Sequence, residues 1–408
     1  MSVIWQPALG AEAERWRALA EQLTTAHFAP LAQELDRDQR YPTENVAVLV
    51  EQRLAGLFIP TRYGGEGATL TATAAVVEAI ATGCASTAAI LCTYQLGAFP
   101  VLLAGREEQK ELYLGAMARG VATSFALSER AAGSDAAALS ASARRDGEGW
   151  RLEGEKYWIG NGGASRYYVV FARTDAHPDA HPHPDADAHH GAGAGRLGIS
   201  GISAFMVDRD APGVLIDELA DKMGLRGTRT SNLKLGLTVP DSARLGEVGR
   251  ALRLALATLE VGRILVAAQS LGVALAAYRD AAGRAVARET FGRPIIDNQA
   301  IGFRLADVAV EISAARMMLY EAAKAYDAGQ NVSTLGAMAK LYASEVAHRA
   351  VDAAVQVWGG LGYCKPSLAE RLYRDQRVLE IYEGSSEIQR LVLARTVRKE
   401  AEAAGCSG

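Results

Sequence analysis

The sequence predicts an α+β protein with an N-terminal helical domain, a central antiparallel β-domain and a C-terminal four-helix bundle. Residues 1–120 carry apolar side chains at three- and four-residue spacing, which is typical of helices. Residues 121–245 contain short alternating segments separated by polar turns, which indicate an antiparallel sheet. Long helical patterns return over residues 246–408. We therefore expect three domains with these boundaries.

The N-terminal third is expected to be helical with glycine-containing interruptions. Glu12–Leu35 is rich in Ala, Leu and Glu, and TRYGGEGAT (61–69) is predicted to be a loop because of its glycines. Helical patterns then resume, with breaks expected near Gly83 and Gly97. Residues 106–119 are amphipathic and predict a last helix before the β-domain.

The central segment is expected to form strands joined by short turns. ATSFALSE (122–129) predicts a first strand, and residues 140–160 carry Gly-Glu-Gly near their centre, which indicates a hairpin. Further strands are predicted at residues 166–174, 202–210, 213–219 and 232–239.

The C-terminal third contains four amphipathic segments followed by a last helix from about Ser386. Four helices in sequence fit an antiparallel bundle. The four segments are residues 252–279, 284–290, 301–327 and 334–357.

A histidine-rich segment, DAHPDAHPHPDADAHHGAGAG (175–195), contains five of the seven histidines. Alternating His, Asp, Pro and Ala cannot build a core, so we expect an exposed loop. Histidine and aspartate are also metal ligands, but a metal site needs a rigid shell to fix its geometry, and this segment offers none. The sequence therefore predicts no metal.

Composition narrows the class of protein. The net charge of −4 and the pI of about 6.0 argue against nucleic-acid binding, which usually requires a basic surface. The four cysteines form no CxxC pair and are expected to be thiols in a reducing compartment. The first residues lack a signal-peptide pattern, and no continuous apolar run reaches the roughly 18 residues of a membrane span. We expect a soluble cytoplasmic protein.

Four motifs carry residue types suited to a planar cofactor and an acid–base reaction. FALSERAAGSD (125–135) places hydroxyls at a turn, and GEKYWIGNGG (154–163) sets aromatics beside an Asn-Gly turn. RETFGRPIIDNQ (288–299) contains arginines suited to pyrophosphate oxygens. Taken alone, the first is more typical of an ordinary strand and turn, and the second of a hairpin with core aromatics. The third is equally typical of a solvated helix end.

The fourth motif combines VQVWGGLGY (355–363) with RLYRDQRVLEIYEGSSEIQR (371–390). Its glycines allow a backbone to approach a ligand closely. Glu383 lies between Tyr382 and Gly384, and a carboxylate among aromatic and apolar neighbours has its pKa raised by desolvation. A general base for a weak carbon acid needs such a pKa near neutral pH. A single glutamate is more often a surface charge.

In order and spacing, these motifs together resemble the acyl-CoA dehydrogenase family. FALSE-x-x-AGSD and IYEGSSEIQR resemble the two signatures of that family, and the resemblance also includes KMGLRGTRTSNLKL (222–235) and LEVGRILVAAQSLG (259–272). It spans about residues 15–396. It implies the helical, β, helical fold, FAD as cofactor and a homotetramer in which FAD reaches a neighbouring subunit.

The resemblance also implies which residues contact FAD. Phe125, Leu127 and Ser128 match residues that line the flavin, Trp158 matches an aromatic packed against it, and Gly160 stands where the family has a threonine or serine that bonds flavin N5. The remaining matched contacts, several of which receive FAD from the partner subunit, are Arg288, Thr290, Phe291, Gln356, Gly360, Ser385 and Glu387.

The resemblance assigns the catalytic base to Glu383. A minority of the family instead uses a glutamate immediately before the arginine that matches Arg263, and Gly262 stands there in this chain. Residues that match the substrate site are Ser134, Glu260, Arg263 and Tyr382. The implied reaction converts an acyl-CoA to a trans-2-enoyl-CoA, with electrons passing on to an electron-transfer flavoprotein.

Two departures from the family pattern affect what the resemblance implies. Arg130 replaces a proline and adds a charge near the mouth of the site. Gly160 removes one hydrogen bond to the flavin, worth about 0.5–1.5 kcal/mol. Three alternatives stay open: a carrier-protein-bound acyl substrate, an oxygen-using flavin monooxygenase on the same fold, and a DNA-binding branch that the acidic balance disfavours.

Overall fold

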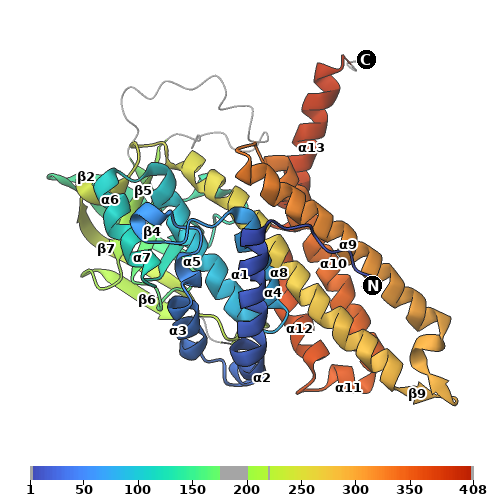
Figure 1. Ribbon diagram of the computed structural model, residues 1–408. Coiled ribbons are helices and arrows are strands. Elements are labelled where there is room, and N and C mark those ends of the chain that lie inside the picture. The colour runs from blue at the N-terminus through green and yellow to red at the C-terminus, as the bar shows by residue number, and fades with distance from the viewer. Residues whose placement is uncertain (1–2, 175–200, 219–220, 406–408) are drawn as a thin grey trace.

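The computed structural model describes residues 3–174, 201–218 and 221–405. The predicted histidine-rich loop at 175–195 lies outside the described residues. A helical N-terminal part, a β-sheet and a helical C-terminal part follow one another along the chain, which confirms the predicted fold class (Figure 1).

The N-terminal part consists of short and medium helices packed around two apolar ones. Its helices are α1 (Ala11–Leu23), α2 (Ala29–Asp38), α3 (Thr43–Glu51), α4 (Leu70–Ala81), α5 (Ala85–Ala104), α6 (Glu107–Gln109) and α7 (Gly115–Ala118). A π-helical turn at Thr24–Phe28 joins α1 to α2 just before Pro30, which has no backbone N–H to continue an α-helical ladder. Helix α5 is long and apolar enough to cross a membrane, but 78% of its most apolar window is buried in the protein, as expected of a core helix.

The predicted break at Gly97 is wrong, because α5 continues through it. A β-carbon on Gly97 would lie 2.2 Å from the carbonyl oxygen of Thr123. The glycine therefore allows the helix to approach the first strand closely instead of ending the helix. The predicted break near Gly83 is confirmed, since α4 and α5 are separate helices there.

The sheet is mostly antiparallel, with strand order β6-β7-β3-β2-β4-β5-β8. Parallel pairings join β1 to β4 and β2 to β4. The predicted hairpin is confirmed as β2 and β3, in which Asp146 pairs with Gly149 around the turn. The strands are β1 (Thr123–Ala126), β2 (Ser142–Asp146), β3 (Gly149–Gly160), β4 (Tyr167–Thr174), β5 (Ile202–Asp208), β6 (Val214–Glu218), β7 (Thr230–Pro240) and β8 (Arg244–Leu245).

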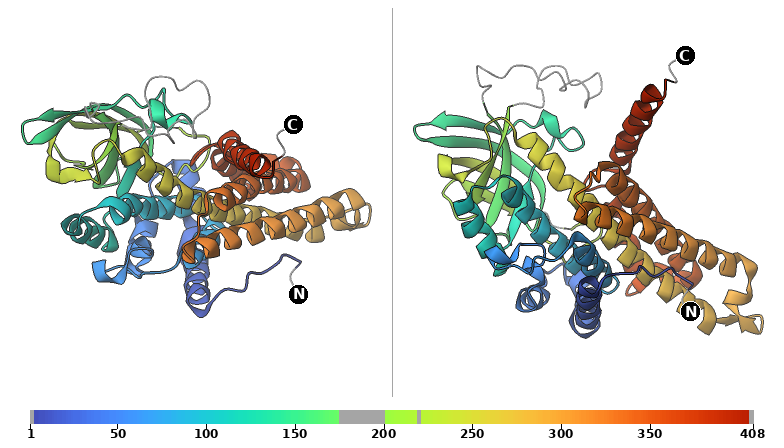
Figure 2. Two further views of the ribbon diagram at one scale, coloured as in Figure 1. Left: turned by 90° about the horizontal axis from the view of Figure 1, so that it is seen from above. Right: turned by 45° about the horizontal axis from the view of Figure 1, so that its top comes forward.

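The C-terminal part is built on three long helices, α8 (Ala251–Ala287), α9 (Gln299–Asp327) and α10 (Ser333–Trp358). Helix α8 begins beside the sheet and runs to a small hairpin at the far end of the helical domain (Figure 1). Both views of Figure 2 show the sheet and this hairpin at opposite ends of α8. Shorter helices follow at α11 (Gly360–Tyr363) and α12 (Leu368–Gln376), and the chain ends in α13 (Ser386–Ala403); α12 and α13 pack against α10.

The predicted separate helix at 284–290 is wrong. Residues up to Ala287 continue α8, and the following residues form a hairpin of β9 (Glu289–Thr290) and β10 (Arg293–Pro294). A glycine inside a helix costs only about 1 kcal/mol, so Gly283 does not end α8 while its neighbours Ala281 and Ala285 are buried.

One hydrophobic core joins the N-terminal and C-terminal helices, with members on α1, α4, α5, α8, α9 and α10. A second cluster packs one face of the sheet against α5 and the start of α8. Helix α5 belongs to both clusters and therefore fixes the sheet relative to the long helices.

Candidate active site

The middle of α5 is the place where the sheet, α8 and the chain before α13 meet. Gly97 contacts β1, as described above. A β-carbon on Gly160, the last residue of β3, would lie 3.3 Å from Oγ1 of Thr93. A β-carbon on Gly262 of α8 would lie 3.1 Å from Cδ2 of Leu96. Three glycines thus let three elements approach a single helix closely.

Glu383 lies at this junction, in the turn that precedes α13. It adopts a φ of 54°, and Gly384 follows with a φ of 88°, so two consecutive residues are left-handed. Left-handed conformations are uncommon for non-glycine residues and cluster at functional sites. The Oε2 atom of Glu383 is buried and accepts no hydrogen bond from the described residues. A β-carbon on Gly262 would lie 2.7 Å from that oxygen.

Burial raises the pKa of Glu383 to about 7, and the positive charges of Lys340 and Arg263 limit the rise. Desolvation disfavours the ionised form of a carboxyl, while nearby cations favour it. A carboxylate with a pKa near neutrality and a free oxygen is chemically suited to accept a proton from a weak acid.

Two buried side chains hold the turn that carries Glu383. The ammonium group of Lys340, on α10, donates a hydrogen bond of 2.8 Å to the Gly384 carbonyl. The side-chain amide of Gln389, on α13, donates to the same carbonyl at 2.8 Å and to the Glu383 carbonyl at 3.2 Å. Both side chains are fully buried. The strained turn is therefore fixed from two helices.

Arg263 lies one turn of α8 beyond Glu260 and is 6% exposed. Its Nε and Nη1 atoms have no hydrogen-bond partner among the described residues. Burial lowers its pKa, and the charges of Glu260 and Glu383 oppose that change. An unpaired buried guanidinium is costly, so the group is available to a polar ligand group at this site.

On the sheet side, a buried ion pair joins two of the sequence motifs. The Nζ atom of Lys156 donates to Oε1 of Glu129 at 2.7 Å and to the Leu127 carbonyl at 3.1 Å. Glu129 also accepts hydrogen bonds from Ser140 and from the Ala141 amide. The positive charge of Lys156 and these donors outweigh burial and hold the pKa of Glu129 below its usual range. The pair fastens the turn after β1 to β3.

An irregularity in β3 turns aromatic surface outward. The register of β3 against β7 shifts between Lys156 and Ile159, and Trp158 within that bulge has a φ of 57°. The Trp158 side chain is 55% exposed, although it is a large apolar ring. Phe125 of β1 is partly buried and packs on Phe171 at a ring separation of 5.0 Å. The sheet therefore offers aromatic surface that a planar ligand can cover.

The structure separates the predicted site residues into two groups. Phe125 and Leu127 share a hydrophobic cluster with Ala255 of α8, less than two turns before Glu260. These two residues belong to the first group, which lies at the sheet end of α8. The first group comprises Phe125, Leu127, Ser128, Trp158, Gly160, Glu260, Arg263, Tyr382 and Glu383.

The second group lies at the other end of α8. Trp358, two residues after Gln356, donates to Asp280 at 2.5 Å. Asp280 lies 20 residues beyond Glu260 on α8, or about 30 Å along the helix axis. The members of this group are Arg288, Thr290, Phe291, Gln356 and Gly360. Within one chain they do not meet Glu383, and Figure 1 shows β9 at the end of the helical domain that lies away from the sheet.

Ser134, Ser385 and Glu387 belong to neither group, and Tyr382 of the first group is held inside the helical core. Ser134 is exposed on the loop after β1. The Tyr382 hydroxyl donates to Gln269 inside the helical core, and Gln269 in turn donates to the Ala85 carbonyl at 3.0 Å. Ser385 is the N-cap residue of α13, and its hydrogen bond to Glu387 lowers the pKa of that exposed carboxyl.

Lys340, Gln389, Thr93 and Leu96 surround the junction, and the sequence did not single out Lys340 or Gln389. A lysine on an otherwise buried, alanine-rich face of a predicted helix was a usable signal for Lys340, because a buried lysine requires a partner. The contacts of Thr93 and Leu96 depend on long-range packing and had no local signal.

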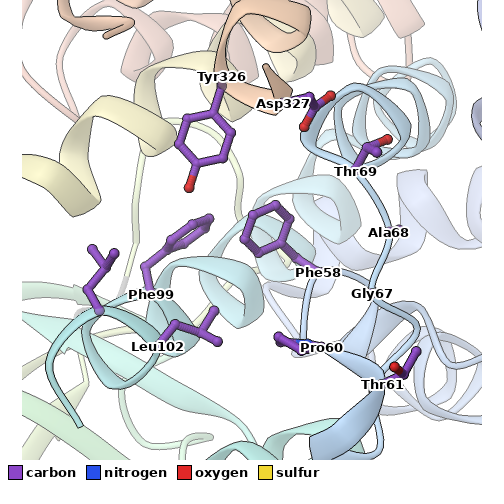
Figure 3. A pocket seen from close by; sticks show the side chains of 11 residues that line it. Phe58, Pro60, Thr61, Gly67, Ala68, Thr69, Phe99, Leu102, Tyr326 and Asp327 are labelled. Atoms are coloured by element: carbon purple, nitrogen blue, oxygen red, sulfur yellow. The ribbon is translucent and has the colours of Figure 1, made fainter. Parts of the chain in front are cut away.

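A pocket of about 550 Å³ lies elsewhere, between α5, the loop before α4 and the end of α9. Figure 3 shows Phe58, Phe99 and Tyr326 around it. Its carboxylate, Asp327, is already bonded to the Leu70 and Thr71 amides and the Thr71 hydroxyl, so it caps α4. Because neither Glu383 nor Arg263 lines this pocket, the junction at α5 is the better candidate for chemistry.

Comparison with known proteins identifies the family of the chain. Three family profiles match in order along the chain: "Acyl-CoA dehydrogenase, N-terminal domain" at residues 10–121, "middle domain" at 124–236 and "C-terminal domain" at 249–398. The chain is 39% identical over 370 residues to the mitochondrial short-chain specific acyl-CoA dehydrogenase of Bos taurus, covering 90% of this chain and 85% of that protein.

Two solved structures are similar over almost the whole chain. Butyryl-CoA dehydrogenase from Megasphaera elsdenii superposes with a TM-score of 0.89 at 33% identity, covering 96% of this chain and 100% of that one. The prolyl acyl carrier protein oxidase AnaB superposes with a TM-score of 0.87 at 27% identity, with coverages of 96% and 100%. The resemblance inferred from the motifs is thus confirmed: the chain belongs to the acyl-CoA dehydrogenase family and is an oxidoreductase.

Proposed function

We propose that the protein catalyses the α,β-dehydrogenation of a short acyl-CoA to the trans-2-enoyl-CoA, with Glu383 as the base that removes the α-proton. The observation that carries this proposal is the buried, unpartnered Oε2 of Glu383, whose pKa is raised to about 7. The bovine relative and the butyryl-CoA dehydrogenase structure support a short acyl chain by their names.

FAD is the cofactor that membership of this family implies, and the residues of the chain fit it. The outward-facing Trp158 and the partly buried Phe125 supply aromatic surface for a flavin ring, with Leu127, Ser128 and Gly160 beside them. When bound, FAD supplies the acceptor for the β-hydrogen, which leaves the substrate as a hydride.

The protein residues would orient the substrate and move the proton. Glu383 takes the α-proton on its free Oε2, and the electron pair of that C–H bond forms the new double bond as the β-hydride departs. Negative charge develops on the thioester oxygen during this step, and a hydrogen bond from the Glu383 amide would stabilise it, as in an oxyanion hole. Arg263 favours the ionised carboxylate before the reaction.

Assembly and electron transfer extend the proposal. Arg288, Thr290, Phe291, Gln356 and Gly360 lie far from Glu383 in one chain, which fits a homotetramer in which they contact the FAD of a neighbouring subunit. An electron-transfer flavoprotein is the proposed acceptor for the electrons.

A carrier-protein-bound acyl thioester is the second candidate substrate. The similarity to AnaB, a prolyl acyl carrier protein oxidase, favours it, as does Arg130, an exposed cation after Glu129 that lies 5.6 Å from the Tyr157 ring. A carrier protein delivers the acyl group on the same phosphopantetheine arm as CoA. The two candidates therefore differ in what docks outside the active site, where the positive charge of Arg130 would favour an acidic partner.

An anaerobic titration tests both candidates. The FAD-loaded protein is mixed with butyryl-, isobutyryl- and octanoyl-CoA, and with butyryl-carrier protein, while the flavin absorbance is followed. Bleaching by butyryl-CoA at micromolar concentration is the expected result. Bleaching by the carrier-bound ester alone would replace the first candidate with the second, and no bleaching by any ester would contradict both.

A further inference from the structure

Lys340 is a buried cation that the reaction as described above does not use. It lies on α10, is fully buried, and makes one hydrogen bond among the described residues, 2.8 Å to the Gly384 carbonyl. Burying a lysine costs several kcal/mol unless partners compensate the charge. A single neutral carbonyl is weak compensation, so a nearby carboxylate is expected to supply the rest.

The charges of three carboxylates act on Lys340: Glu383, Glu380 and Glu387. Glu380 is already engaged, because it contacts His348 at 2.9 Å, Gln376 at 2.7 Å and Arg377 at 3.4 Å. Glu387 is exposed and bonded by Ser385. Glu383 has no hydrogen-bond donor at its Oε2 among the described residues, so it is the carboxylate left to balance the charge of Lys340.

We propose that Lys340 is a positioning residue for the base: its ammonium group holds the Glu383–Gly384 turn through the Gly384 carbonyl, and its charge favours the ionised carboxylate. The inference rests on the proposed role of Glu383. Lys340 acts through Glu383 and is not assigned a contact with the substrate.

Electrostatics support this geometry. Lys340 is the cation that lowers the pKa of Glu383 most, ahead of Arg263. Burial lowers the pKa of Lys340 itself to about 8, so its charge is present below that pH and lost above it. The ionisable groups around this pair are Arg263 on α8, Cys92 on α5, and Glu380, Tyr382 and Glu387 on the segment before and at the start of α13.

The chain offers a matched control for the charge. Gln389 donates to the same Gly384 carbonyl at the same distance of 2.8 Å, is equally buried, and carries no charge. Lys340→Met and Gln389→Met each remove one donor to that oxygen and leave the other in place. Gln389→Met also removes the 3.2 Å hydrogen bond to the Glu383 carbonyl, so it disturbs the turn at least as much. Only the first removes a positive charge near Glu383.

The test is an infrared titration of the FAD-loaded protein without substrate, between pH 5 and 10. The protonated carboxyl band of Glu383 is identified by its loss in Glu383→Gln. We expect its midpoint to rise by about 1 pH unit in Lys340→Met and to stay unchanged in Gln389→Met. Lys340→Gln, which keeps a donor, is the second variant should Lys340→Met not fold, with the same expected rise.

An unchanged midpoint in both Lys340 variants, or an equal rise in Gln389→Met, would overturn the proposal. The titration requires no turnover, so it is separable from a failure of the proposed function, which would show as an absence of flavin bleaching by acyl thioesters. If turnover is present, the acid limb of kcat against pH is expected to move upward in Lys340→Met and not in Gln389→Met.

Discussion

Gly262 and Glu383 are complementary: the place where a side chain would begin on Gly262 is 2.7 Å from the carboxylate oxygen Oε2 of Glu383. That distance is shorter than a van der Waals contact, so no residue larger than glycine fits at position 262 without moving the carboxylate. Position 262 is also where a minority of related proteins is expected to carry the base. In this chain, Gly262 leaves free the space that the Glu383 carboxylate occupies.

Gly262→Ala is therefore expected to lower kcat about 100-fold, because a displacement of about 1 Å is enough to cost that much. The added methyl group would also lie 3.1 Å from Leu96. Gly283→Ala, on the same helix, is the control, since its β-carbon meets nothing within 4 Å. We expect that control to keep full activity and gain slight stability. Equal kcat values for Gly262→Ala and Gly283→Ala would show that the position of Glu383 does not depend on a glycine at 262.

The raised pKa of Glu383 predicts a pH-dependent stability. The unfolded carboxyl titrates near 4.5 and the folded one near 7, so the folded state holds the proton more tightly. Stability is therefore lost as the pH rises from about 4.5 to about 7, and the loss is complete above that range. Glu383→Gln has no such loss.

We expect Glu383→Gln to be more stable than the wild type at pH 8, by on the order of 1–3 kcal/mol, and equally stable near pH 4.5. Thermal unfolding of the FAD-loaded proteins across that range is the measurement. Glu148→Gln, in the exposed turn between β2 and β3, is the control and should follow the wild type at every pH. A pH-independent difference for Glu383→Gln would argue against a buried ionisation.

We expect the loss of the Lys156–Glu129 ion pair to weaken the binding of FAD. Removing one partner of a buried ion pair is strongly destabilising, here for the turn that carries Leu127 and Ser128. Lys156→Met is expected to raise the Kd for FAD at least tenfold, measured by the return of flavin fluorescence on dilution. Lys234→Met removes the exposed Lys234–Glu155 pair of the same sheet and should leave the Kd unchanged. A Lys156→Met protein that retains FAD normally would show that the pair serves the fold alone.

We expect a second chain to bind at Phe291. Its side chain is 100% exposed at the tip of the β9–β10 hairpin, with a φ of 51°. Phe291→Asp is compatible with that backbone conformation and is expected to reduce the mass of the assembly in light scattering after size exclusion. Leu215→Asp, at an exposed apolar residue on β6, is the control and should not change the mass. Identical masses for all three proteins would place the subunit contact elsewhere.

The sequence predicted the order of domains, the β2–β3 hairpin and the resemblance to the family, because these depend on local periodicity and on motifs. It failed at Gly97 and at the predicted boundary between residues 279 and 284, where tertiary packing keeps a helix continuous through a glycine. Periodicity cannot tell a glycine that ends a helix from one that allows a close contact.

The candidate site was predicted where a motif carried it and missed where distant segments meet. Glu383 was assigned from the Tyr-Glu-Gly run. The contact between Lys340 and Gly384 joins residues 44 positions apart, and the contact between Thr93 and Gly160 joins a helix to a strand. Neither pairing is encoded in neighbouring residues, so only the folded structure reveals them.

The central claim is that Glu383 is the base, and the rate of flavin reduction tests it most directly. Wild type and Glu383→Gln, both loaded with FAD, are mixed anaerobically with the acyl-CoA that bleaches the wild type fastest, at pH 8. We expect a rate at least 100-fold lower in the variant, with FAD still bound. A rate within a few-fold of the wild type would contradict it, because the α-proton would then be removed by another group.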